Sequence, residues 1–351
     1  MDFSHVNADG IHALHPPQSK LPQTPSTSRV PIRLTPELYR SAAGRLTRVG
    51  ADERARAAEQ FVQVAPEHGI DLSRTFVTVQ RDGLGAPTEV LEACLSVAGA
   101  GRTAVLFLSG PDPAGGGHDD RVATIEAVCR FMANNDAPVL AQMLPEPGET
   151  WTIRALTEAG FSRVGDLAYL RRPLGGATQV PPLPTGIVAT PVREFRPGSA
   201  DWRDLGEAME RSYEQTLDCP ELCGLRGTDD VIASHQAAGE WDPALWWVVR
   251  EGDRPVGCML LNPFPAQGSV DLVYLGLACE VRGRGVARAL LAEGVARATE
   301  RGHASMTCAV DRRNVPALRL YKGMGFAEFS GRVAFVRMIE HAERGERGLR
   351  T

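Results

Sequence analysis

The sequence has no excess of positive charge and no long apolar run, and both absences limit its function. Its 38 Lys and Arg residues are outnumbered by 43 Asp and Glu residues, which gives a formal net charge of −5. A general nucleic-acid binder would need a basic footprint, so we expect no nucleic-acid partner. No stretch approaches the roughly 20 consecutive apolar residues that cross a membrane, so we expect no membrane partner.

Two further features are missing. The first residues, MDFSHVNADGIHALHPP, lack the basic and apolar segments of a secretory signal. The seven cysteines are odd in number and scattered from Cys94 to Cys308, which is not the pattern of a disulfide framework. We therefore expect a cytoplasmic protein that is a monomer or a homodimer.

Proline-rich stretches divide the 351 residues. Residues 1–30 are rich in Pro, Ser, Thr and Gln without an apolar period, which predicts a disordered leader. Residues 173–186 hold four Pro and three Gly, so they continue neither a helix nor a central strand. We interpret them as a linker between a domain at 31–172 and a domain at 187–340, followed by a tail at 341–351.

Each half alternates strand-like and helix-like segments, which predicts an α/β fold with a mixed sheet (α+β). The two halves also match each other. A shift of 165 residues places RALTEAGF (154–161) on RLYKGMGF (319–326), and helix and strand segments before it coincide without a gap. We interpret this as an internal duplication of one domain.

The most informative motif begins at the end of an apolar strand, 270–277, and leads into an amphipathic helix. Glycine lets the backbone pass close to a bulky ligand, and the free amides of a first helical turn bind a diphosphate. A dinucleotide site would need a third Gly where Arg288 stands, and a nucleotide P-loop would need Gly-Lys-Ser/Thr. The other interpretations are a coenzyme A loop and a helix cap without a ligand. The motif is Arg282-Gly283-Arg284-Gly285-Val286-Ala287.

The segment that follows raises this motif above a plain helix cap. Asn314 stands at a strand exit, Tyr321 lies two helical turns later on the same face, and Gly325-Phe326 ends the segment. Together these residues resemble the GNAT superfamily of acyl-CoA-dependent N-acetyltransferases. The loop of that family, Arg/Gln-x-x-Gly-x-Gly/Ala, is matched by Arg282, Gly285 and Ala287. The resemblance implies acetyl-CoA as co-substrate, with Asn314 contacting it and Tyr321 near the thioester sulfur.

The first half resembles a degenerate copy of the same domain. It has Glu149 and Leu156 at the positions equivalent to Asn314 and Tyr321. Two acids, Asp119 and Asp120, stand near its Gly-rich turn and would repel a diphosphate. The arrangement is therefore similar to the tandem mycothiol synthases, with a degenerate first domain and a catalytic second domain.

The resemblance implies transfer of an acetyl group to a primary amine of a small molecule by direct attack. Tyr321 would protonate the leaving thiolate, and a backbone amide near Leu277 would hold the oxyanion. Asp271 is the candidate base because strand alternation puts it on the face of Leu277, and Glu280 is the alternative. A different class of function, a non-catalytic acyl-CoA sensor or scaffold, fits the same motifs.

The segment 211–230 is expected to line the acceptor site. Its polar residues would suit an amine, and we predict that four of them bind the substrate. Cys219, Cys223 and His235 invite a zinc interpretation, but a single Cys pair is a poor zinc motif, so we expect no metal. The four predicted substrate residues are Tyr213, Glu214, Thr216 and Asp218.

Overall fold

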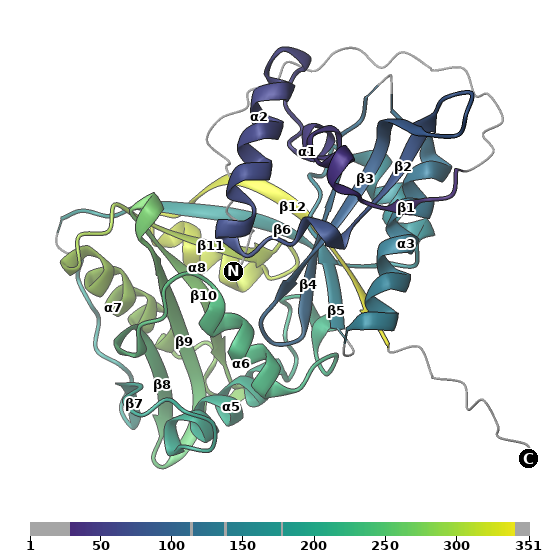
Figure 1. The fold of residues 1–351 in the computed structure, drawn as a ribbon. Coiled ribbons are helices and arrows are strands. Elements are labelled where there is room, and N and C mark those ends of the chain that lie inside the picture. Colours follow the sequence, from purple (N-terminus) through teal and green to yellow (C-terminus); the bar gives the residue numbers. More distant parts are fainter. Residues whose placement is uncertain (1–28, 113–114, 137–138, 177, 341–351) are drawn as a thin grey trace, which may run out of the picture. The chain divides into compact units, whose positions relative to one another are not determined.

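The computed structural model describes residues 29–112, 115–136, 139–176 and 178–340. Nearly all of the predicted leader and the whole predicted tail lie outside these residues. The contacts divide the chain into two units, which Figure 1 draws together without fixing their relative placement. Of the described residues, the C-terminal unit contains Gly99–Gly101 and Val164–Ala334, and the N-terminal unit contains those up to and including Ala98, those within Arg102–Arg163 and those from Phe335 on. Among the described residues, no helix is both long and apolar enough to cross a membrane.

The same order of strands and helices occurs twice (Figure 1). The first half runs β1 (Ile32–Arg33), α1 (Tyr39–Leu46), α2 (Ala51–Val64), β2 (Thr75–Arg81), β3 (Pro87–Gly99), β4 (Thr103–Leu108), α3 (His118–Asn135), β5 (Val139–Met143), α4 (Thr150–Glu158) and β6 (Ser162–Pro173). The second runs β7 (Ile187–Pro191), α5 (Ala200–Tyr213), α6 (Thr228–Ala237), β8 (Trp246–Glu251), β9 (Arg254–Phe264), β10 (Ser269–Leu277), α7 (Val286–Glu300), β11 (Ser305–Asp311), α8 (Val315–Gly323) and β12 (Ala327–Ile339). Because α4 and α8 have equal length and lie 165 residues apart at both ends, the fold supports the predicted duplication.

The sheet of the C-terminal unit has the order β12-β6-β11-β10-β9-β8-β7. β10 and β11 are parallel, and β10 pairs with β9 in antiparallel fashion. Alternating side chains divide the core between the two faces of this sheet. On one face Met259 and Leu261 pack with Leu290 and Leu291 of α7 and with Tyr321 of α8. On the other, Cys258 and Leu260 pack with residues of α5 and α6, namely Leu205, Met209 and Ile232.

The N-terminal unit repeats this design with the strand order β1-β2-β3-β4-β5-β12. β4 and β5 are its parallel pair, joined through Thr103–Val105 and Leu140–Gln142. Apolar residues of the strands, including Val77, Val79 and Val90, pack with Ala42 of α1 and Ala65 after α2.

The last strand of each half lies in the sheet of the other unit. Leu167–Pro173 of β6 pairs with Ser305–Asp311 of β11. The end of β12, Phe335–Ile339, pairs with Val139–Met143 of β5. The two units therefore differ from the predicted domains 31–172 and 187–340 at these strands, since sequence order does not determine the partner of a strand.

Candidate active site

Parallel strands β10 and β11 separate at their carboxyl ends. They pair only from Ser269 to Asp271 and from Ser305 to Thr307, although β10 continues to Leu277 and β11 to Asp311. A bulge between Leu272 and Tyr274 also interrupts the pairing of β10 with β9. A bulge adds twist and redirects a strand. We call the opening between these two unpaired strand ends the splay.

The bulge corrects the predicted position of Asp271. Residues paired across antiparallel strands project to the same face. Asp271 pairs with Asn262, whereas Leu277 pairs with Gly257, five residues away, so the two lie on opposite faces. The extra residue in β10 breaks the simple alternation on which the prediction relied. Asp271 therefore faces the side of α5 and α6, and Leu277 the side of α7 and α8.

The backbone of Leu277 is directed toward the splay. The amide of Ala278 donates to the carbonyl of Val256 at 2.8 Å, on the β9 side. Successive backbone groups of a strand alternate in direction, so the N–H and C=O of Leu277 point away from β9. The Leu277 carbonyl accepts a hydrogen bond from Nε of Arg282 at 2.9 Å.

The turn before α7 presents open backbone. Gly283 and Gly285 have φ angles of 74° and 88°, in the left-handed region, and no atom lies within 4 Å of a Cβ built on either. Within the described part of the chain, the amides of the first turn of α7 have no backbone acceptor. Arg288 is exposed one turn into the helix and makes no ion pair with a described residue. This site therefore fits a diphosphate.

The arginines that flank this turn have other partners. The guanidinium of Arg282, the first residue of the matched family loop, donates to the carbonyls of Ser212, Glu214 and Gln215 at 2.8–3.2 Å. Arg284 forms an ion pair with Glu251 at 2.8 Å. The guanidinium of Arg282 consequently holds the end of α5. Arg284 is partly neutralised.

The equivalent helix of the N-terminal unit is closed by the protein itself. Oδ2 of Asp120 accepts from the amide of Gly117, the N-cap of α3, at 3.0 Å. A Cβ on Gly115 would lie 2.1 Å from Arg45, and one on Gly116 would lie 2.7 Å from Glu92. A carboxylate and packed side chains thus fill the place that the turn before α7 leaves open, which agrees with the predicted degeneration of this copy.

Asn314 and Tyr321 mark the two ends of α8. Asn314 is the N-cap, and its Oδ1 accepts from the amide of Ala317 at 3.2 Å. Tyr321 is 6% exposed and packs against the ring of Phe326, with 5.7 Å between the centroids. Burial raises the pKa of Tyr321 well above its usual range, and nearby Cys308 and Asp218 add to the shift. The phenol therefore keeps its proton near neutral pH.

The two candidate bases differ in environment. Asp271 is 5% exposed at the point where β10 and β11 separate, and it accepts a hydrogen bond from the Thr307 hydroxyl. Glu280 forms ion pairs with Arg211 and with Arg254 at the surface. Asp271 is thus the carboxylate next to the splay, whereas Glu280 is engaged elsewhere.

The four predicted substrate residues lie at and after the end of α5. Tyr213 is half-buried, and burial raises its pKa to about 12. Glu214 contributes its carbonyl to Arg282, and Oγ1 of Thr216 accepts from the amide of Asp218 at 3.1 Å. Asp218 is exposed as a residue, and desolvation of its carboxylate raises its pKa. Tyr213 therefore ends α5, and the other three residues lie in the loop that follows it.

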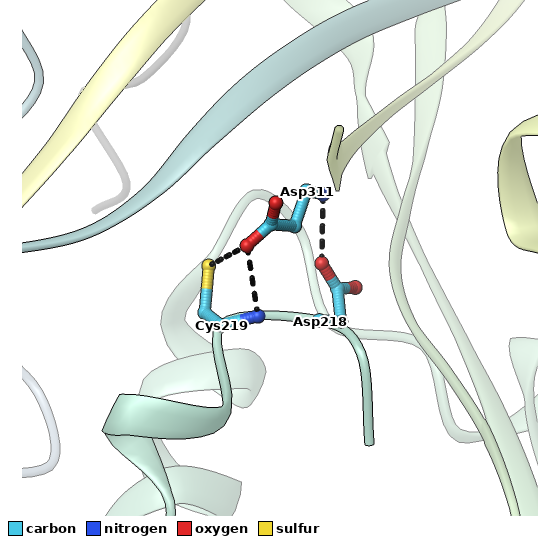
Figure 2. Close-up of side chains that lie close together, drawn as sticks. All are labelled: Asp218, Cys219 and Asp311. Atoms are coloured by element: carbon cyan, nitrogen blue, oxygen red, sulfur yellow. Dashed lines mark hydrogen bonds between the residues drawn. The ribbon is translucent and has the colours of Figure 1, made fainter. Parts of the chain in front are cut away.

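Figure 2 shows three side chains that meet where this loop lies against the end of β11: Asp218, Cys219 and Asp311. Asp311 is fully buried, and its Oδ2 accepts from the Cys219 amide at 3.2 Å. Its own amide donates to Oδ1 of Asp218 at 2.8 Å. Among the described residues, this is the group that could hold a metal ion by proximity, and neither Cys223 nor His235 belongs to it. The guanidinium of Arg313 already lies 2.6 Å from Oδ2 of Asp311 and supplies positive charge there.

Sequence reasoning missed three residues of this region. Asp311 is one. The others are Tyr274, just after the bulge, and Ser212, whose oxygens lie 2.6 Å apart. Ser212 donates to the Met209 carbonyl at 2.7 Å, so the hydroxyl of Tyr274 donates to Ser212. The segment Asp-Arg-Arg-Asn at the end of a strand did place Asp311 close to Asn314. The hydrogen-bond partner of Asp311, Cys219, could not be predicted, because it lies far away in the sequence.

The fold agrees with comparisons to known proteins. Residues 209–326 match the model of the acetyltransferase (GNAT) family. This match lies within the C-terminal unit and includes both the turn before α7 and helix α8. A crystal structure of a GCN5-related N-acetyltransferase from Sphaerobacter thermophilus matches with a TM-score of 0.57 and 23% identity, over 89% of this chain and 96% of that one. That likeness extends the same fold to both units.

Curated relatives carry a more specific name. The mycothiol acetyltransferase of Thermobispora bispora is 30% identical over 213 residues, and that of Salinispora arenicola is 29% identical over 225 residues. The alignments cover 59% and 61% of this chain and 65% of each relative. The chain thus matches just under two thirds of the length of these relatives.

Proposed function

We propose that the C-terminal unit transfers an acetyl group from acetyl-CoA to a primary amine of a small molecule by direct attack. The observation that carries this proposal is the open N-terminus of α7 beside the splay, contrasted with its closed counterpart at α3. Backbone amides and the positive end of a helix dipole attract a diphosphate. Arg288 adds a positive charge at the same place. The N-terminal unit lacks the open turn, so we assign it no catalytic role.

Acetyl-CoA would be held by backbone more than by side chains. The amides from Gly283 to Ala287 face open space and suit the diphosphate. Asn314 stands at the start of α8, where the family places a cofactor contact, although its Oδ1 also caps that helix. The acyl end would enter the splay, where strand pairing stops after Asp271.

The two faces of the sheet suit the two proton transfers. Asp271 lies on the α5/α6 side and would take a proton from the ammonium, directly or through water. The amine nitrogen then attacks the thioester carbon, and the Leu277 amide would stabilise the oxyanion. When the carbon–sulfur bond breaks, the thiolate would receive a proton from Tyr321 on the α7/α8 side. The nitrogen would release its second proton to solvent, and solvent would restore the proton of Tyr321.

The loop after α5 would bind the acceptor. Asp218 carries the carboxylate in this loop that lies near both Tyr321 and Tyr274, because it raises the pKa of both phenols. A carboxylate there attracts an ammonium group, and Tyr213, Glu214 and Thr216 would line the approach. The name of the relatives makes mycothiol-related amines the first acceptors to test.

The test is amine-dependent release of CoA from acetyl-CoA by the purified full-length protein. A thiol reagent would follow a panel of primary amines, including mycothiol-related amines and aminosugars. We expect at least one amine to raise the release of CoA above hydrolysis, with an acetylated product of matching mass. Binding of acetyl-CoA without release in the presence of any amine would instead favour the acyl-CoA sensor.

A further inference from the structure

The loop that follows α5 holds an unfavourable backbone conformation. Four non-glycine residues of the described chain have positive φ angles, and two of them, Gln215 at 50° and Cys219 at 45°, lie in this loop. Such residues persist only where surrounding structure fixes them, at a cost of about 1–3 kcal/mol each. We call residues 214–221 the acceptor loop. Its two strained positions lie next to two sets of hydrogen bonds.

The first set comes from the turn before α7, residues 282–285, which we call the cofactor turn, and from the segment just before it. The last carbonyls of a helix have no partner inside the helix. Here Arg282 supplies three such bonds, to Ser212, Glu214 and Gln215. The Cys279 thiol adds a fourth, to the Glu214 carbonyl at 3.2 Å. The start of the acceptor loop is therefore fixed by residues directly before Gly283.

The second set comes from the end of β11. The carboxylate of Asp311 binds the amide of Cys219, and the amide of Asp311 binds the carboxylate of Asp218 (Figure 2). Arg313 extends this network, because it bonds to Asp311 and to both oxygens of Glu221, at 2.6 and 2.9 Å. The end of the acceptor loop is thus fixed by residues directly before Asn314.

Arg313 and the buried carboxylate depend on each other. Burial alone would raise the pKa of Asp311, but the hydrogen bonds from Arg313 and from the Cys219 amide outweigh it and lower the pKa. Asp311 is therefore ionised at neutral pH. A buried charge that loses a hydrogen-bonding partner is costly, so this end of the loop resists rearrangement.

The cofactor turn itself has little to fix it. Gly283 and Gly285 carry no side chain, and a Cβ on either would face open space. Glycine has the greatest backbone freedom of any residue. A ligand that orders this turn would also order Arg282, and the residues that Arg282 holds would lose freedom with it.

We propose that Arg282 is a positioning residue that couples the cofactor turn to the acceptor loop, so that CoA binding stabilises the loop that receives the amine, while Asp311 fixes the far end of that loop. The inference rests on the proposed function, because it requires CoA at the turn before α7. Coupling between two sites is reciprocal, so a bound acceptor strengthens CoA binding by the same factor. Neither residue touches the reacting atoms.

Hydrogen exchange of the full-length protein, with CoA alone as the probe, tests this without a known acceptor. In the wild type, saturating CoA is expected to slow exchange at 283–288 and also in the acceptor loop, by at least about fivefold, the lower end of usual coupling. In Arg282→Gln the slowing at 283–288 remains and that at 214–216 disappears. Arg284→Gln is the matched control: it removes a charge from the same turn without touching the loop, so slowing at 214–216 persists.

Asp311→Asn provides a second variant at the other end of the loop. Exchange at Cys219 is expected to be fast with or without CoA, whereas the turn at 283–288 is still protected. Protection of the turn in the wild type with an unchanged loop would overturn the coupling and leave the proposed function intact. Absence of protection at 283–288 in the folded wild type would overturn the proposed function and this inference with it.

Discussion

Replacing Tyr321 with Phe is expected to lower the turnover number by about 10²–10⁴-fold, the usual contribution of a general acid. Acetyl-CoA affinity should stay nearly unchanged, because the lost hydroxyl acts mainly in the transition state. The measurement is steady-state kinetics with calorimetric binding of acetyl-CoA. The buried ring, packed on Phe326, is retained in the variant.

Tyr169→Phe is the matched control for this loss. Tyr169 is also 6% exposed, lies on β6 of the same unit and has no assigned role in the reaction. The control variant should keep its turnover number. Full turnover in a folded Tyr321→Phe protein would exclude Tyr321 as the acid, and equal losses in both variants would indicate a structural effect of removing any buried phenol.

Asp271→Asn is expected to lower kcat/KM by a similar factor, about 10²–10⁴-fold, because the amide cannot accept the proton of the amine. The substitution keeps the size of the side chain and its place opposite Asn262. Thr307→Val serves as the control, since it removes the hydroxyl that donates to Asp271 but leaves the carboxylate. That control should keep most of the rate.

Comparison of Asp271→Asn with Thr307→Val shows whether Asp271 is the base. Nearly full activity in a folded Asp271→Asn protein would contradict the role of Asp271 and favour Glu280, the alternative base. A loss of acetyl-CoA binding in Asp271→Asn would show instead that the residue supports the cofactor site.

Local patterns predicted the fold well. The repeat between RALTEAGF and RLYKGMGF corresponds to α4 and α8, and the turn at Arg282–Ala287 lies where the pattern of strand, glycines and helix placed it. These features depend on neighbouring residues, through helix period and glycine conformation. Such local features can be predicted from a single sequence, because the residues that determine them are close together in the chain.

The features that the sequence did not reveal depend on distant partners. The exchange of β6 and β12 pairs strands that are far apart in the sequence, and no residue of β6 signals its pairing with β11. The bulge after Leu272 inserts one residue and reverses the face of Leu277 relative to Asp271. A single inserted residue is enough to invalidate any argument from alternation.

The sequence did not reveal which groups the charged side chains bind. The three arginines in and after the cofactor turn have different surroundings: Arg282 binds the Ser212 carbonyl of α5, Arg284 binds Glu251, and Arg288 is exposed. A guanidinium serves as a helix cap or as an anion site with the same chemistry. Only the position of carbonyls from a segment about 70 residues earlier decided the role of Arg282.

The central claim is that one of two copies of the domain binds acetyl-CoA, at the turn before α7. Separated halves would not test it, because each would lose a strand to the exchange of β6 and β12. Calorimetry of the full-length chain does, with Gly285→Ala and Gly302→Ala as the decisive pair. Both glycines have positive φ angles, 88° and 79°, with open space around them, but Gly302 follows the far end of α7.

An alanine in the left-handed region costs about 1–2 kcal/mol at either glycine, so the two variants carry a comparable backbone penalty. We expect one acetyl-CoA per wild-type chain, the same stoichiometry and affinity in Gly302→Ala, and binding at least about tenfold weaker in Gly285→Ala, since 1.4 kcal/mol corresponds to a factor of ten. Two sites per chain, or unchanged affinity in a folded Gly285→Ala protein, would contradict the account.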